Sequence, residues 1–230
     1  MKLARPDIFH PRIVLAGPAQ HGAGHPDDAG LLAALRHRGL HARWLSWDDP
    51  GTRDADLVIL RATPGRAERL DEFLAWTTSV ANLLNPPGAV AWNLGERYLR
   101  DLENAGLPTC LGGPARKPVA LILFGGEASH AFTDAGAVEP EFECWDAGQA
   151  AIAAAAEHCG IGIGELLYAR VDVSAGPDGV RVAGLDLVAP SLGWRRLDLA
   201  TRELAQRRFA LAVESACERL GLGPFPHGRP

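Results

Sequence analysis

A chain of 230 residues with 47% apolar residues can bury the core of one large domain or of two small ones. Its formal net charge of −5 comes from acidic and basic residues scattered along the sequence, so it lacks the basic stripe of a nucleic-acid-binding surface. No apolar run reaches the length of a membrane span, the N-terminus has no apolar signal segment, and the four widely spaced cysteines form no CxxC pair. We therefore expect a cytoplasmic protein that contacts neither nucleic acid nor membrane.

The first half of the sequence has the pattern of an α/β domain. Apolar, often β-branched runs predict strands at residues 12–16, 41–45, 56–61 and 89–92. Helical periodicity occurs at residues 30–38, 68–80 and 96–105. This alternation predicts an open, mostly parallel sheet over residues 1–108.

The second half predicts an antiparallel sheet with helices. The pair Gly125-Gly126 separates apolar strands at 119–124 and 129–133, which is typical of a hairpin because tight turns need a positive φ. A second hairpin joins strands at 166–174 and 179–188, and helices are expected at 147–159 and 198–220. We therefore divide the chain into an α/β domain at 1–108, a second domain at 109–222 and a tail at 223–230.

Charged residues on the second hairpin form the most informative cluster. Alternate residues of a strand share a face, so Arg170 and Asp172 point together, as do Gly184 and Asp186 on the next strand. Carboxylate oxygens are suitable ligands for Mg²⁺, and a guanidinium binds phosphate oxygens. This pattern suits phosphoryl transfer, although spacing alone also allows a simple cross-strand ion pair on a solvated face.

Eight short motifs follow one another along most of the chain, at residues 47–50, 56–63, 72–76, 84–86, 92–99, 126–131, 167–172 and 187–192. Their order resembles the ATP-grasp superfamily, which includes glutathione synthetase and D-alanine:D-alanine ligase. In that family an Arg-x-Asp strand and a following Glu-x-Asn or Glu-x-Glu strand bind Mg²⁺ and the terminal phosphates of ATP. The resemblance therefore implies a pre-ATP-grasp-like first domain, an ATP-grasp-like second domain, a phosphate-binding Arg170, and Asp172 and Asp186 as Mg²⁺ ligands.

The sequence also departs from that family at positions that matter for ATP. Gly184 stands where relatives have a glutamate, and Ala189 replaces a glutamate usually found before the proline. The family's nucleotide-clamping subdomain is reduced to residues 110–118, where Lys117 is a remaining candidate for contact with ATP. We therefore predict a degenerate, shortened ATP-grasp protein that is not an active ligase. We expect it to be a homo-oligomer that binds a small molecule or a partner protein in the interdomain cleft or on an exposed sheet.

The alternative is a minimal carboxylate–amine ligase with Mg²⁺ and ATP as cofactors, completed if necessary by a partner chain. In this alternative Arg170 steadies a phosphate, Asp172 and Asp186 hold Mg²⁺, and Arg61 orients the acyl substrate. The missing clamp and Gly184 favour the binding protein, whereas ATP-dependent product formation would favour the ligase.

Histidines provide two weaker candidates. His130, on the first hairpin, is a possible catalytic base, although a lone histidine there is more often a rim or turn residue. A Gly-rich loop carries His21, His25, Asp27 and Asp28 and has some features of a metal site. We expect Asp28 instead to cap the helix that follows it.

Overall fold

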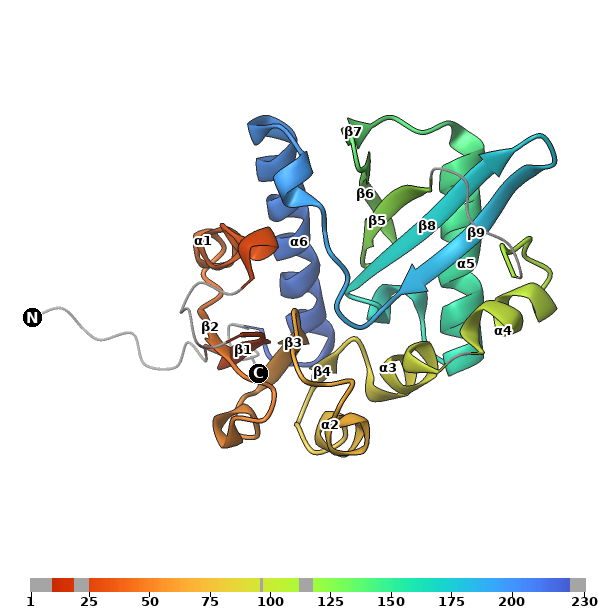
Figure 1. The fold of residues 1–230 in the computed structure, drawn as a ribbon. Coiled ribbons are helices and arrows are strands. Elements are labelled where there is room, and N and C mark those ends of the chain that lie inside the picture. The colour runs from red at the N-terminus through yellow and green to blue at the C-terminus, as the bar shows by residue number, and fades with distance from the viewer. Residues whose placement is uncertain (1–9, 19–24, 96, 112–117, 224–230) are drawn as a thin grey trace, which may run out of the picture.

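The computed structural model describes residues 10–18, 25–95, 97–111 and 118–223, which form two sheets connected by helices (Figure 1). The first sheet has four parallel strands in the order β2-β1-β3-β4, which confirms the predicted open parallel sheet. All residues of its two central strands are buried, as expected for a parallel sheet covered on both faces. The strands are β1 (Ile13–Ala16), β2 (Ala42–Leu45), β3 (Leu57–Leu60) and β4 (Leu83–Leu84).

Four α-helices occur in the first half of the chain: α1 (Leu31–His37), α2 (Leu70–Thr77), α3 (Pro87–Leu94) and α4 (Tyr98–Asn104). Of these, α3 and α4 contact α5 (Phe142–Cys159) of the second half (Figure 1). The strand predicted at residues 89–92 is wrong, because this segment belongs to α3 and the fourth strand comes earlier. Pro87 is the first residue of α3. Proline favours this position, since its fixed φ suits the first helical turn and its missing N–H is not needed there.

The second sheet has five antiparallel strands in the order β7-β6-β5-β8-β9. Both predicted hairpins are confirmed, and Gly125 and Gly126 adopt φ values of 59° and 89° in the first turn. Helix α5 (Phe142–Cys159) packs on β8 and β9 and covers one face of the sheet (Figure 1). The strands are β5 (Val119–Phe124), β6 (Glu127–Thr133), β7 (Gly136–Val138), β8 (Tyr168–Gly176) and β9 (Gly179–Asp186).

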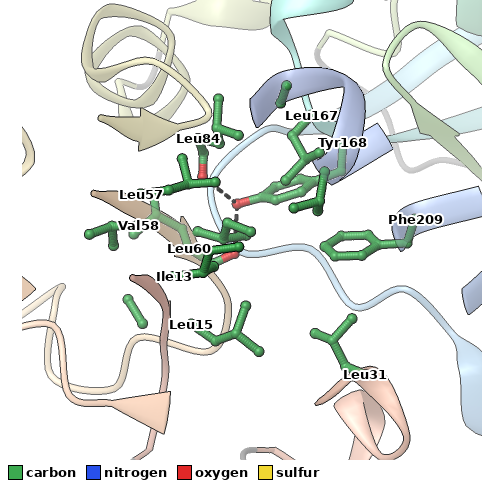
Figure 2. Packing of buried hydrophobic residues seen from close by; sticks show 14 of the residues in the cluster. Ile13, Leu15, Leu31, Leu57, Val58, Leu60, Leu84, Leu167, Tyr168 and Phe209 are labelled. Atoms are coloured by element: carbon green, nitrogen blue, oxygen red, sulfur yellow. Dashed lines mark hydrogen bonds between the residues drawn. The ribbon is translucent and has the colours of Figure 1, made fainter. Parts of the chain in front are cut away.

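Helix α6 (Leu199–Arg219) stands between the two sheets (Figure 1). Asp198 caps it, accepting a hydrogen bond from the backbone N–H of Thr201 at 3.0 Å. The helix packs against α1 on one side and against β5 and β6 on the other. Its fully buried Phe209 lies in one core with Leu15 from the first sheet and Tyr168 from the second (Figure 2). The two predicted domains thus share apolar packing, and the boundary at residue 108 remains a prediction.

Polar contacts also join the two sheets. The phenol oxygen of Tyr168, at the start of β8, donates to the carbonyl of Leu60 at 2.7 Å (Figure 2). It also lies 2.9 Å from the carbonyl of Val188. Asn85 donates to the carbonyls of Tyr168 and Leu187 at 2.9 and 2.7 Å. These contacts hold the end of β3 beside the segment that leaves β9.

Two further points concern the chain as a whole. Over the described ranges, no helix is both long and apolar enough to cross a membrane. The predicted tail lies outside the described residues except for Gly223.

Candidate functional site

The charged residues predicted on the second hairpin lie together on one face of the five-stranded sheet. The strand register places His130, Ile122, Arg170 and Asp186 in one row across β6, β5, β8 and β9. The neighbouring row contains Phe132, Ala120, Asp172 and Gly184. The helix α5 covers the opposite face, so these rows lie on the face turned away from α5. The sequence prediction that Arg170, Asp172 and Asp186 share a face agrees with this register.

Arg170 is held from two sides. Its Nε donates to Oδ1 of Asp172 at 2.9 Å, and the guanidinium carbon lies 5.4 Å from the centroid of the Phe132 ring. Both partners of the ion pair keep 28% of their side-chain surface exposed. The guanidinium is therefore positioned by its neighbours and still accessible to an anionic group.

The two carboxylates of this cluster are in different environments. The pKa of Asp172 is raised above its ordinary value, and burial is the largest cause. The ion pair with Arg170 opposes this rise, and the charge of the nearby Asp186 adds to it. Oδ1 of Asp186 accepts hydrogen bonds from the backbone N–H groups of Val188 and Ala189 at 2.9 and 3.1 Å. Each carboxylate therefore has one oxygen committed to a protein partner.

The donor set does not fit a metal ion held by the protein alone. Beside Asp172 and Asp186, Gly184 offers no side-chain oxygen, and within the described residues no three His, Cys, Asp or Glu side chains cluster closely enough to hold a metal. Lys117, the predicted remnant of the nucleotide clamp, lies outside the described residues. His21, from the predicted metal loop, also lies outside them.

A second candidate site lies at the end of β3, where Arg61 is almost fully buried. Its Nε and Nη2 lie 2.9 and 2.8 Å from Oδ1 of Asp28, and Nη2 also donates to the carbonyl of Pro190 at 2.9 Å. Its Nη1 has no hydrogen-bond partner among the described residues. Asp28 does not cap the helix α1, whose N-cap is Gly30, so that prediction is wrong. The carboxylate instead neutralises Arg61.

Arg61 lines a cavity of about 470 Å³ between the first sheet and the segment that follows β9. Arg66 also lines it and donates to the hydroxyl of Thr63 at 3.0 Å, without an ion pair in the described part of the chain. Asp27 and Ser191 line the same cavity, and Oδ2 of Asp27 accepts a hydrogen bond from the Ser191 hydroxyl at 2.5 Å. The lining thus contains two guanidinium groups and two carboxylates, those of Asp27 and Asp28, and both carboxylates already have a protein partner. The remaining lining residues are Pro18, His25, Ala62, Pro64, Ala189 and Pro190.

His130 is separated from Arg170 by the strand β5, which places the Cα atoms of the two residues about 10 Å apart at the usual strand spacing. Its Nε2 lies 2.7 Å from the carbonyl of Leu192, and its Nδ1 lies 3.0 Å from the hydroxyl of Ser129. Burial is the largest cause of its lowered pKa. These contacts favour a neutral, positioning role, and the predicted catalytic role remains untested.

Two residues near these sites, Tyr98 and Asn93, were not among the candidates identified from the sequence. Tyr98, from α4, lies close to Gly184 and the two carboxylates, and burial is the largest cause of its raised pKa. Asn93 donates to the carbonyl of Leu185 and accepts from the backbone N–H of Leu187, which fixes the end of β9. Both residues lie in the 92–99 motif, but their contacts join segments about 90 residues apart, so no local pattern reveals them.

The parallel sheet and the antiparallel sheet together match the fold of solved ATP-grasp ligases, so the predicted resemblance to these ligases is confirmed at the level of the fold. The family model of the D-cycloserine synthetase DcsG, N-terminal domain, matches residues 13–85. The cycloserine biosynthesis protein DcsG of Streptomyces lavendulae is 35% identical over 117 residues, which cover 48% of this chain and 36% of that protein.

Solved structures agree with this fold. The crystal structure of D-cycloserine synthetase DcsG superposes with a TM-score of 0.73 at 22% identity, covering 90% of this chain and 99% of that one. The ATP-grasp ligase PsnB, solved with the precursor peptide PsnA2 and AMPPNP, has a TM-score of 0.55 at 15% identity and covers 91% of this chain and 99% of that one. At these identities the likeness shows a common fold, and it leaves activity and substrate open.

Proposed function

We propose that this chain is an ATP-grasp-fold protein that binds a small carboxylate-bearing molecule in the Arg61 cavity and does not act alone as a Mg-ATP-dependent ligase. The observation that carries the proposal is Arg61, which helps line the cavity and whose Nη1 is a buried donor without a partner among the described residues. A carboxylate can satisfy this donor, because its two oxygens match the fork of a guanidinium. Arg66 supplies further positive charge.

The position of the cavity in the fold supports a binding role. The chain leaves β1 towards β2 on one side of the sheet, whereas β3 pairs with β1 on the other side. Ligands of open α/β sheets bind outside the carboxyl ends of strands at such a switch point. Arg61 directly follows the last residue of β3 and therefore lies at this place.

A second candidate function is the predicted carboxylate–amine ligase. It is favoured by the shared face of Arg170, Asp172 and Asp186, and by the synthetase and ligase activities named for DcsG and PsnB. In this case Arg170 would contact a phosphate, Asp172 and Asp186 would hold Mg²⁺, which would supply positive charge at this face, and Arg61 would orient the carboxylate to be activated. It requires binding of Mg²⁺ and nucleotide by a donor set that lacks a third carboxylate.

The binding proposal predicts that Arg66→Gln weakens carboxylate binding by about tenfold or more, since one charge-assisted hydrogen bond contributes about 1.5–3 kcal/mol. The ¹⁵N-labelled protein is titrated with acetate, with succinate and with the D- and L-enantiomers of alanine, and the backbone amide chemical shifts are followed by NMR. We expect at least one of these probes to shift the amides of residues 61–63, 65, 66, 189 and 191 in a saturable manner.

Arg69→Gln is the matched control for this titration. Arg69 is an exposed arginine three residues away that pairs with Asp48 and Glu72 and does not line the cavity. It should therefore leave the affinity unchanged. Equal effects of the two substitutions, or no saturable shift with any probe, would refute the proposed binding site.

The setting and partners of the protein are part of the same proposal. We infer a reducing compartment, such as the cytoplasm, because all four cysteines are free and burial raises the pKa of three of them, that of Cys217 to about 11. A peptide is an alternative ligand for the Arg61 cavity, since PsnB was solved with a precursor peptide. The expected homo-oligomer and a partner chain that completes the nucleotide clamp remain proposals.

A further inference from the structure

We propose that Arg170 is the resident cation of the sheet face next to Asp172 and Asp186, and that the missing side chain at Gly184 closes this face to divalent metal ions. Arg170 directly faces Asp186 on β9 and is bonded to Asp172 on its own strand. Its guanidinium is ion-paired with Asp172, and Asp186 stands opposite Arg170 on the neighbouring strand. A metal ion would have to compete with the guanidinium for Oδ1 of Asp172.

The charge balance supports this inference. Two carboxylates and one guanidinium leave a net charge of −1, and each carboxylate has one oxygen engaged by a protein donor. Oxygen sites gain affinity for a divalent ion mainly through additional carboxylates. At distances of about 5 Å in water, one unit of charge changes the affinity for a divalent ion by about tenfold or more. With only Asp172 and Asp186, the cluster lacks the further carboxylate that would raise its affinity for a divalent ion.

Space does not explain the glycine at position 184. A Cβ added there would lie 3.6 Å from Oδ2 of Asp172 and 4.0 Å from the phenol oxygen of Tyr98, which are ordinary contacts. Gly184 is also absent from the glycines with positive φ, so a side chain meets no backbone strain. A glutamate at this position would thus extend from beside Asp172 on the face that carries Asp186.

The test measures Mn²⁺ binding by electron paramagnetic resonance of the free ion, because Mn²⁺ accepts the same oxygen ligands as Mg²⁺. We expect no binding by the wild type up to about millimolar Mn²⁺, and at least tenfold tighter binding by Gly184→Glu. Gly184→Gln is the matched control, which has the same size without the charge, and should behave as the wild type. Mn²⁺ should also raise the melting temperature of Gly184→Glu, but not that of the wild type or of Gly184→Gln.

Arg170→Gln tests the other half of the inference without altering Gly184. Removal of the guanidinium leaves a net charge of −2 and should tighten Mn²⁺ binding by about tenfold as well. Gly184→Asp replaces Gly184→Glu if the longer side chain prevents folding, as judged by circular dichroism. The inference is overturned by submillimolar Mn²⁺ binding to the wild type, by equal affinities of folded Gly184→Glu and Gly184→Gln, or by an Arg170→Gln variant that binds no tighter.

Discussion

Replacing Arg61 with methionine is expected to lower the free energy of unfolding by about 3–5 kcal/mol. Arg61 and Asp28 keep only 3% and 2% of their side-chain surfaces exposed. Methionine removes the guanidinium but keeps an apolar chain, so Asp28 is left as a buried carboxylate without its ion-pair partner. The carbonyl of Pro190 also loses its donor. Urea unfolding followed by circular dichroism measures the change.

The double variant Arg61→Met/Asp28→Leu separates the charge from the packing. Because it removes both ions, it should recover much of the stability lost in the single variant, as replacement of a whole buried ion pair by apolar residues is often close to neutral. Carboxylate binding should not recover, since the free Nη1 is still absent. A loss below about 1 kcal/mol in Arg61→Met would show that the pair is neither dry nor important for folding.

Phe209→Ala is the second large effect, with an expected loss of about 3–5 kcal/mol. The ring is fully buried, and its centroid lies 5.3 Å from that of Phe124, 6.0 Å from Trp194 and 6.5 Å from Tyr168. It connects α6 with the second sheet in the core shared with the first sheet (Figure 2). The truncated side chain leaves a cavity that rigid helices and strands can fill only in part.

The position of Phe209 also tests how the two halves unfold. Because both sheets share its core, one cooperative transition should shift to lower urea, as seen by circular dichroism and by tryptophan fluorescence. Leu211→Ala, on the same helix but 47% exposed, is the control and should change stability by less than about 0.5 kcal/mol. Two separate transitions, of which only one moves, would contradict the shared core and favour independent domains.

Much of the fold could be predicted because its signals are local. Gly125 and Gly126 fix a hairpin through their own backbone preferences, and strand alternation places Arg170 beside Asp172 whatever surrounds them. The segment 89–92 shows the limit of such signals. A short apolar run fits a strand or a buried helix equally well. Pro87, which precedes this run, favours the first position of a helix, and the segment is helical in the structure.

The Arg61 cavity could not be predicted in the same way. It depends on contacts between Arg61 and Asp28, 33 residues apart, and between Arg61 and Pro190, 129 residues apart. In the sequence, Asp28 has the residue type and position of a helix cap. In the structure, its pairing with the buried guanidinium of Arg61 outweighs the stabilisation of about 1 kcal/mol that a helix cap provides. The same holds for Tyr168, whose hydroxyl bridges elements from both halves of the chain.

Calorimetric titration of the purified wild-type chain with Mg²⁺ and AMPPNP tests the central claim most directly. If the fold now serves carboxylate binding without the metal and nucleotide chemistry of a ligase, no saturable heat will appear up to about millimolar nucleotide, although the protein is folded and its Arg61 cavity still binds a carboxylate. Micromolar, Mg²⁺-dependent binding of AMPPNP that disappears in Asp172→Asn would contradict the proposed binding function. It would favour the carboxylate–amine ligase in its place.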